Sequence, residues 1–125
     1  MARSLTPAKE DYLEAILRLV REGSVARSRD IAKHLGVHKS TVTAALKSLG
    51  EAGLIHYAPY EAITLTAAGE KLAEDVFRRH EALRAFFVDV LRVAPDVAEA
   101  AACGMEHAVP KEVIEKMADF ARGKR

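Results

Sequence analysis

The residues best suited to chemistry in this chain stand close together near its C-terminal end. Residues 103–107 read Cys-Gly-Met-Glu-His, and Cys103, Glu106 and His107 are the three side chains there that can hold a metal ion. On a helix, side chains three or four positions apart lie on one face, so the thiol, carboxylate and imidazole point the same way. Taken alone, the same triplet also fits a buried cysteine beside two surface polar residues.

Three further residues extend this set of possible ligands. Asp11 and Glu14 repeat the three-residue spacing near the N-terminus, and His80 lies at the edge of an apolar stripe, where a histidine is more often a core residue than a ligand. Thiolate, imidazole and carboxylate donors together suit a divalent first-row transition metal better than calcium or magnesium, which prefer oxygen ligands. The combination therefore favours a transition-metal site.

The first element that must position these groups is a helix beginning at Thr6. Threonine is a good N-cap, and Pro7 fits the first helical position, where its missing N–H costs nothing. Apolar residues then recur at helical spacing until Gly23, which ends the run. The predicted inward-facing residues of this helix are Tyr12, Leu13, Ile16, Leu17 and Val20.

The next elements have the order of a winged helix-turn-helix. Helices are predicted over 28–35 and over about 38–51, separated by Gly36, which permits the tight turn between them. Two β-rich runs, 54–57 and 63–66, flank a turn that contains proline and predict a hairpin. A hairpin directly after a helix with a polar N-terminal end is typical of the wing in this type of DNA-binding domain.

The remainder of the chain is predicted to be helical. A helix over about 67–91, with Thr66 as its cap, has a broad apolar side that needs a partner, and in so small a chain we expect a second subunit. Further helices are predicted over 95–110 and 111–121. The fold class is therefore mainly α, with a winged helix-turn-helix domain at 1–70 and a helical dimerisation and metal-binding domain at 71–125.

The composition excludes several classes of protein. The chain has 125 residues, half of them apolar, a net charge of +1 and one cysteine, which is typical of a small globular protein without a disulfide. No apolar run approaches the roughly 18 residues of a membrane span. Residues 1–7 lack the apolar core of a signal peptide. We therefore expect a cytoplasmic protein.

Eight polar residues are candidates for contacting DNA. Three are expected to face base edges from the start of the third helix, and the others to face phosphates or to be ordinary solvated surface. The groove-facing set is Ser40, Thr41 and Thr43; the phosphate-facing set is Lys39, Lys47, Arg27 and Arg29; His38 fits either set.

Taken together, these segments resemble a known family. They are residues 10–14 (Glu-Asp-Tyr-Leu-Glu), the helix-turn-helix from Asp30 to Thr43, Leu65-Thr66 with Gly69, Arg79-His80-Glu81, and Glu106-His107. This combination is similar to the diphtheria-toxin-repressor and manganese-transport-regulator family of bacterial metal-dependent repressors. The resemblance covers nearly the whole chain. It implies a homodimer that binds a double-stranded DNA operator, with no membrane or protein substrate and no catalytic activity.

The resemblance also implies a set of metal ligands. The set is Asp11, Glu14, His80, Cys103, Glu106 and His107. Carboxylates at the first two positions match the manganese-responsive branch, whereas Cys103 matches the iron-responsive branch, so the site is a hybrid. The implied cofactor is Fe(II) or Mn(II), and Co(II), Ni(II) or Zn(II) can substitute. Arg84 stands where many relatives have a glutamate, which argues against a separate ancillary site, because arginine cannot ligate a metal.

Three alternatives stay open at this point. The first is a winged-helix regulator that senses a small organic ligand and would bind DNA equally well after chelation. The second is a small metalloenzyme that uses Glu106 as a general base, although nothing in the sequence indicates the substrate cleft it would need. The third is a purely structural dimer, which predicts no affinity for DNA.

Overall fold

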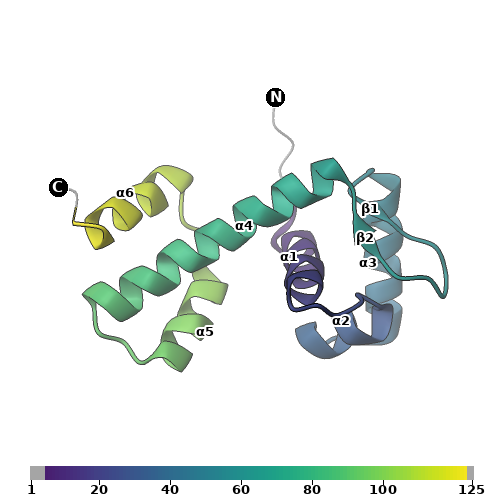
Figure 1. Ribbon diagram of the computed structural model, residues 1–125, viewed down its shortest axis with the longest axis horizontal. Coiled ribbons are helices and arrows are strands. Elements are labelled where there is room, and N and C mark those ends of the chain that lie inside the picture. Colours follow the sequence, from purple (N-terminus) through teal and green to yellow (C-terminus); the bar gives the residue numbers. More distant parts are fainter. Residues whose placement is uncertain (1–4, 124–125) are drawn as a thin grey trace. The chain divides into compact units, whose positions relative to one another are not determined.

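The computed structural model describes residues 5–123; residues 1–4, from the segment without a signal-peptide core, and residues 124–125 lie outside the described part. The elements are α1 (Pro7–Arg21), α2 (Ser28–Leu35), α3 (Lys39–Glu51), β1 (Ile55–His56), β2 (Thr64–Leu65), α4 (Ala67–Ala85), the π-helical turn η1 (Phe86–Val90), α5 (Pro95–Met105) and α6 (Lys111–Ala121). They are labelled in Figure 1, apart from η1. The chain divides into two compact units, residues 1–74 and 75–125.

Helix α1 begins as its sequence predicts. The Thr6 hydroxyl accepts a hydrogen bond from the Lys9 backbone N–H at 3.2 Å, and Pro7 occupies the first turn. The predicted inward-facing residues are buried up to Leu17, but Val20 is 48% exposed. Val20 lies in the last turn, just before Gly23 (φ +83°) ends the helix, so the apolar side stops one turn earlier than its spacing indicates.

Helices α2 and α3 form the helix-turn-helix. Gly36 has a φ of +68° and caps α2 in the left-handed conformation, and its N–H bonds the Ala32 carbonyl at 2.8 Å. Such a backbone is accessible to glycine without steric cost, which explains the residue at this turn. The two helices are packed through fully buried apolar side chains: Ile31, Val42, Leu46 and Leu49.

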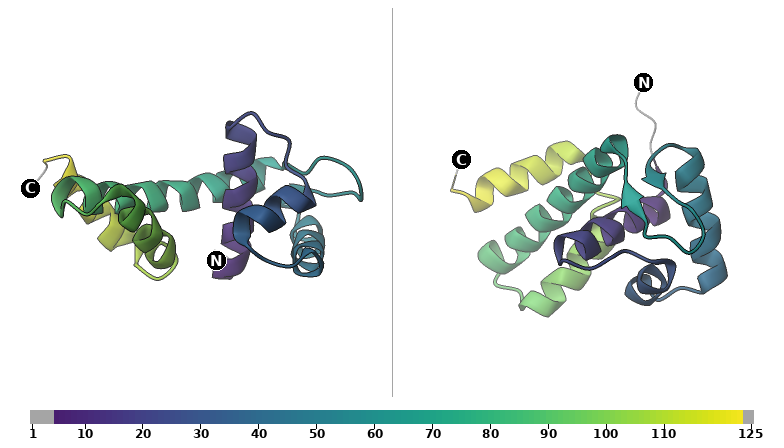
Figure 2. Two further views of the ribbon diagram at one scale, coloured as in Figure 1. Left: turned by 90° about the horizontal axis from the view of Figure 1, so that it is seen from below. Right: turned by 45° about the vertical axis from the view of Figure 1, so that its right-hand side comes forward.

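The wing is a short antiparallel hairpin. Ile55 pairs with Leu65 and His56 pairs with Thr64. Next to β2, the Ile63 N–H bonds the Ala26 carbonyl at 2.8 Å, which ties the hairpin to the loop before α2. The long loop between the strands extends away from the helices of its own unit (Figure 2). These features confirm the predicted winged helix-turn-helix.

The hairpin is joined tightly to the start of α4. The Thr66 hydroxyl donates to the Gly53 carbonyl at 2.8 Å and accepts from the Gly69 N–H at 3.0 Å, so it caps α4 as predicted. A Cβ placed on Gly69 would lie 1.8 Å from the Leu54 carbonyl oxygen. The first turn of α4 therefore contacts the backbone before β1 closely enough to require glycine at position 69.

The second unit is a small helical cluster. Its buried apolar residues are Leu83, Phe87, Ala98, Ala102 and Ile114. The predicted helix over 67–91 is confirmed as far as Val90, but its last turn, η1, is π-helical and follows α4 directly at Phe86. The wider turn brings neighbouring Phe86 and Phe87 into packing together, with the Phe86 ring centroid 6.2 Å from that of Phe120 and Phe87 buried.

Helix α5 is shorter than predicted. It ends at Met105, and residues 106–109 form a turn in which the Val109 N–H bonds the Met105 carbonyl at 3.1 Å. A proline disfavours helical geometry at the residue before it, so the chain leaves the helix before Pro110. In α6, Val113 and Phe120 are 44% and 45% exposed. No helix among residues 5–123 has the length and apolar content to cross a membrane.

Candidate metal centre

A buried histidine lies at the centre of the polar cluster in the second unit. His80, in α4, has a side chain that is only 1% exposed. Its Nδ1 lies 2.6 Å from the Glu106 Oε1 atom, and its Nε2 lies 2.9 Å from the Glu99 Oε2 atom. Both edges of the imidazole ring therefore face carboxylates.

Glu106 is the fully buried member of this cluster. It caps the C-terminal end of α5, and its carbonyl accepts a hydrogen bond from the Arg79 guanidinium at 3.0 Å. Its second carboxylate oxygen, Oε2, lies 3.4 Å from the Nε2 atom of His107. The unit thus brings two of the predicted ligands, His80 and His107, into contact with a third, Glu106.

The donor set fits a divalent transition metal. A buried carboxylate between two imidazoles is costly to desolvate unless positive charge accompanies it. A neutral imidazole has one N–H and cannot donate to two carboxylates, so one of the two contacts of His80 needs an additional proton or a cation, and a metal ion can supply that positive charge. Imidazole and carboxylate donors together suit manganese, iron, cobalt, nickel and zinc.

Cys103 lies on α5, three positions before Glu106, as the helical spacing predicts. Its side chain is exposed, in contrast to the buried cysteine of the alternative interpretation, and Glu106 is buried where that interpretation expects a surface residue. Among the described residues Cys103 makes no disulfide. Its role as a metal ligand stays a prediction.

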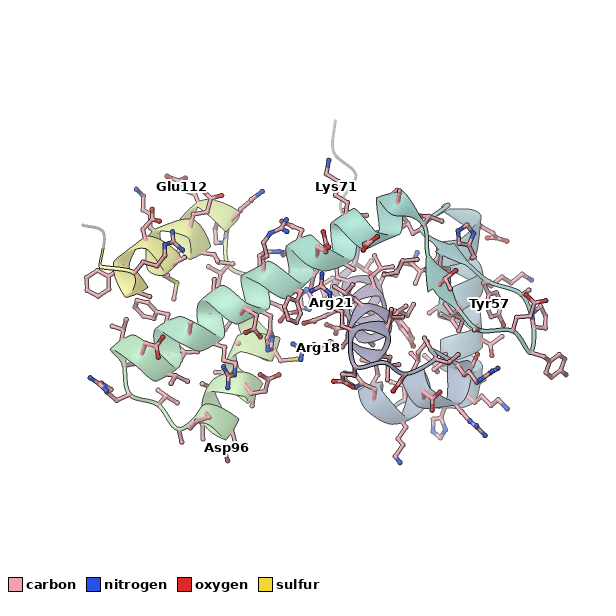
Figure 3. The ribbon with its side chains drawn as sticks, in the orientation of Figure 1. Arg18, Arg21, Tyr57, Lys71, Asp96 and Glu112 are labelled. Atoms are coloured by element: carbon pink, nitrogen blue, oxygen red, sulfur yellow. The ribbon has the colours of Figure 1, made fainter. Side chains whose placement is uncertain are left out.

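The acidic pair of α1 belongs to the first unit. Glu14 is buried and accepts hydrogen bonds from Arg18 (Figure 3) at 2.9 and 3.2 Å. Asp11 is partly exposed. Between them, the Tyr12 hydroxyl is buried without a hydrogen-bond partner among the described residues, and burial raises the pKa of Tyr12. Participation of Asp11 and Glu14 in a metal site stays a prediction.

Sequence reasoning did not assign the supporting roles of three residues in the cluster. Glu99 contacts His80, Arg84 lies 3.3 Å from Glu99, and Arg79 bonds the Glu106 carbonyl. Helical spacing could have indicated two of these roles, because Glu99 lies one turn before Cys103 on α5 and Arg84 lies one turn after His80 on α4. A charged residue one turn from a proposed ligand is a candidate partner of that ligand.

The predicted DNA-contacting residues all lie at the surface of the first unit. The exposed set is Arg27, Arg29, His38, Lys39, Ser40, Thr41, Thr43 and Lys47. The first turn of α3 carries no acidic residue, which suits a helix end that approaches phosphates. The Thr43 hydroxyl donates to the Lys39 carbonyl at 3.1 Å, so part of its hydrogen-bonding capacity is used within α3. Contact with DNA stays a prediction for each of these residues.

Comparison with known families decides the classification. Residues 4–63 match the family described as "Iron dependent repressor, N-terminal DNA binding domain", and residues 66–123 match "Iron dependent repressor, metal binding and dimerisation domain". The chain belongs to the iron-dependent repressor family. The members are metal-dependent transcriptional regulators, which confirms the family resemblance, the predicted fold class and the main functional prediction.

The relatives include transcriptional regulators from bacteria and from Methanocaldococcus jannaschii. The chain is 42% identical over 113 residues to the transcriptional regulator MntR of Escherichia coli O6:H1, covering 90% of this chain and 72% of the relative. It is 34% identical over 112 residues to an uncharacterized HTH-type transcriptional regulator of Methanocaldococcus jannaschii, covering 89% and 90% of the two chains. The family description names iron, and a similar solved repressor holds manganese, so iron or manganese is confirmed as the class of cofactor for this family.

Solved structures share the same fold. A manganese-dependent transcriptional repressor in complex with manganese superposes with a TM-score of 0.83 at 28% identity, covering 91% of this chain and 52% of that chain. The manganese regulator SloR gives a TM-score of 0.80 at 27% identity, covering 94% and 55%. The chain therefore spans about half the length of these solved repressors.

Proposed function

We propose that the chain is a homodimeric repressor that binds a double-stranded DNA operator when Mn(II) or Fe(II) is bound. The observation that carries this proposal is the buried contact of His80, Glu106 and His107 in the unit that matches a metal-binding and dimerisation domain. A buried polar cluster of this kind weakens a small core unless a cation compensates it. A separate unit of the chain supplies the exposed helix-turn-helix.

The proposed ligands come from both units. In the second unit they are His80, Cys103, Glu106 and His107, and in the first unit they are Asp11 and Glu14. The metal, when bound, supplies positive charge that offsets the mutual repulsion of the carboxylates. Within the chain, Arg79 holds the backbone at Glu106, and Arg18 holds the Glu14 carboxylate.

Ligands shared by two units give a mechanism for control by metal. A ligand set that is complete only in one arrangement of the units favours that arrangement by its differential affinity. In a two-fold dimer, the arrangement that suits DNA places the two α3 helices in successive major grooves, roughly 34–36 Å apart. We propose that metal binding increases the population of this arrangement.

On the DNA side, the exposed start of α3 is proposed to enter the major groove. Ser40 and Thr41 are placed there to contact base edges, whereas Lys39 and Lys47 are placed to contact phosphates. Exposure of these side chains and the absence of acidic residues from the first turn of α3 support this assignment. A protein that acts on a chromosomal operator works in the cytoplasm, which is the proposed location.

We propose a regulatory role for the cluster and not a catalytic one. Metal catalysis needs a coordination position that is open to substrate. Glu106, the candidate general base of an enzyme, is fully buried and is already in contact with His80 and His107. This arrangement supports a residue that holds a metal ion more than one that abstracts a proton from a substrate.

The test is operator binding with and without metal. Fluorescence anisotropy of DNA from the region upstream of the protein's own coding sequence should show binding with Mn(II) or Fe(II) and none with a chelator. Binding that persists unchanged in chelator would favour the regulator of an organic ligand, and no binding under any condition would favour the structural dimer.

Salt dependence tests the DNA surface separately. Replacing a phosphate-contacting lysine reduces the slope of log affinity against log salt by about one. We expect this for Lys47→Ala. Lys71→Ala, in an exposed part of α4 (Figure 3), is the matched control and should leave the slope unchanged. Equal slopes for the parent protein and Lys47→Ala would remove Lys47 from the interface.

A further inference from the structure

A chain of polar contacts leads from the surface of the second unit to its buried interior. The Arg84 Nε atom lies 3.3 Å from Glu99 Oε1, and Glu99 Oε2 lies 2.9 Å from His80 Nε2. On its other edge, His80 Nδ1 lies 2.6 Å from Glu106 Oε1. The exposed fractions of the four side chains fall from 38% and 47% at Arg84 and Glu99 to 1% and 0% at His80 and Glu106.

The two edges of the His80 ring are therefore not equivalent. An imidazole that binds a metal uses one nitrogen and keeps its proton on the other, which usually donates to a carboxylate or a carbonyl. The Nδ1 edge faces Glu106, which is a proposed ligand, whereas the Nε2 edge faces Glu99. The proton therefore belongs on Nε2, and Nδ1 is the nitrogen available to a metal.

Arg84 decides the role of Glu99. A guanidinium stays protonated and cannot ligate, so it places a permanent positive charge beside the Glu99 carboxylate. That charge repels a divalent cation at Glu99 itself but stabilises the carboxylate as an acceptor for His80. Arg84 also holds one oxygen of Glu99 in place while the other oxygen faces the ring.

We propose that Glu99 is a positioning residue for the metal centre, held in place by Arg84, and that it fixes His80 with Nε2 protonated and Nδ1 directed to the metal. This role rests on the proposed metal-binding function. It distinguishes Glu99 from Glu106, which holds the metal directly. Residues that orient a ligand in this way commonly change metal affinity by about 10–100-fold when they are replaced.

The first experiment measures metal affinity by isothermal titration of the full chain with Mn(II). Glu99→Leu removes the acceptor and should weaken binding by about tenfold, the lower end of the usual range, because Glu99 is half-exposed. Glu99→Gln keeps an acceptor oxygen without the charge and should lie between Glu99→Leu and the parent. Glu112→Gln changes an exposed carboxylate at the start of α6 (Figure 3) and should match the parent.

A double-mutant cycle tests whether Arg84 acts through Glu99. Arg84→Gln alone should weaken Mn(II) binding by about threefold, which corresponds to a partly exposed ion pair. In the Glu99→Leu background the same change should have no further effect, because its partner is gone. Equal effects in both backgrounds would show that Arg84 does not act through Glu99 and would overturn that part of the proposal.

The decisive readout is the state of the His80 ring. In protein with ¹⁵N-labelled histidine and bound Zn(II), which is diamagnetic, the His80 signals should show a protonated Nε2 and a coordinated Nδ1. Coordination through Nε2, or a loss of affinity in Glu99→Gln as large as in Glu106→Gln, would make Glu99 a ligand and overturn the proposal. A parent protein that binds neither Mn(II) nor Zn(II) would instead refute the proposed function.

Discussion

The two units of this chain differ in what they bury. The first unit is held together by large apolar side chains from every helix and from the hairpin, including Leu13, Ile31, Leu46 and Ile63. It buries one group that can carry charge, Glu14, which is paired with Arg18. The second unit has a smaller apolar core and buries two such groups in contact with each other, His80 and Glu106. A buried pair of this kind contributes little net stability, because the cost of desolvation offsets the attraction.

Small residues occupy the apolar side of the helix that carries Glu99. Ala98 and Ala102 of α5 are fully buried and belong to the same apolar cluster as Leu83 and Phe87. Glu99 and Glu106 lie at the two edges of the His80 ring. The second unit therefore combines a core with small side chains and a buried polar cluster.

The difference has a thermodynamic consequence. Four of the six proposed ligands belong to the second unit, so metal should stabilise that unit more than the first; a ligand at one hundred times its dissociation constant stabilises the folded form that it binds by about 2.7 kcal/mol. Hydrogen exchange should therefore slow more in α5 and α6 than in α2 and α3 when Mn(II) is added. Four sets of substitutions test this difference between the two units.

The largest effect is expected from breaking the buried pair. Glu106→Leu leaves His80 buried without its closest partner and should cost about 3–5 kcal/mol in the free energy of unfolding of the second unit. Hydrogen exchange followed by mass spectrometry should show faster exchange in α5 and α6 and no change in α2 and α3. Uniform loss of protection in both units would show that the units do not differ in this way.

A double variant provides the control for this prediction. His80→Leu with Glu106→Leu replaces the pair by apolar groups and should recover most of the lost stability, because no polar group is left uncompensated. Its melting temperature should also stop responding to Mn(II). A double variant that is still stabilised by Mn(II) would place the metal elsewhere in the chain.

The next largest effect is expected from a substitution that tests the packing of the first unit. Gly69→Ala places a Cβ 1.8 Å from the Leu54 carbonyl oxygen and should destabilise the hairpin and the start of α4 by about 3 kcal/mol. Gly104→Ala is the matched control, because nothing lies within 4 Å of its Cβ and it is helical, so it should stabilise α5 by about 0.5–1 kcal/mol. Chemical denaturation measures both, and tolerance of Gly69→Ala would mean that the junction adjusts.

The same contrast explains how far the sequence predicts the structure. In the first unit, Thr6, Gly36 and Thr66 each have a local role that their type reveals, and apolar spacing gives the core directly. The helices and the hairpin of this unit follow from such local signals. The exposure of Val20 was missed, because spacing alone does not show where a buried side ends.

In the second unit, the missed features are the ends of two helices and a set of contacts between distant residues. The π-helical turn follows from packing of Phe86 and Phe87, and α5 ends at Met105 although apolar spacing continues. The contact of His80 with Glu106 joins residues on different helices; the types of the ligand candidates indicated a metal, but not this geometry. Glu99 and Arg84 look like ordinary surface charges until α4 and α5 are brought together.

The third prediction concerns Cys103, where an exposed thiol stands beside a buried carboxylate. With Co(II), the parent should give an intense thiolate-to-metal absorption band that Cys103→Ser abolishes. Cys103→Glu replaces a soft donor by a hard one and should shift the preference between Mn(II) and Co(II) toward Mn(II) by about tenfold. A Co(II) spectrum that is indifferent to Cys103 would leave the carboxylates and imidazoles as the ligands and favour manganese.

The smallest effect should come from the one buried polar atom of α1 that has no hydrogen-bond partner among the described residues, the Tyr12 hydroxyl. Tyr12→Phe removes this hydroxyl and keeps the ring, so it should leave stability unchanged or raise it by up to about 1 kcal/mol. Tyr57→Phe, in the half-buried part of the hairpin, is the control and should change stability by less than about 0.5 kcal/mol. Urea denaturation of both variants with chelator present measures the difference. A loss of stability in Tyr12→Phe would show that the hydroxyl is hydrogen-bonded, for example to a buried water, and that the first unit also depends on a buried polar contact.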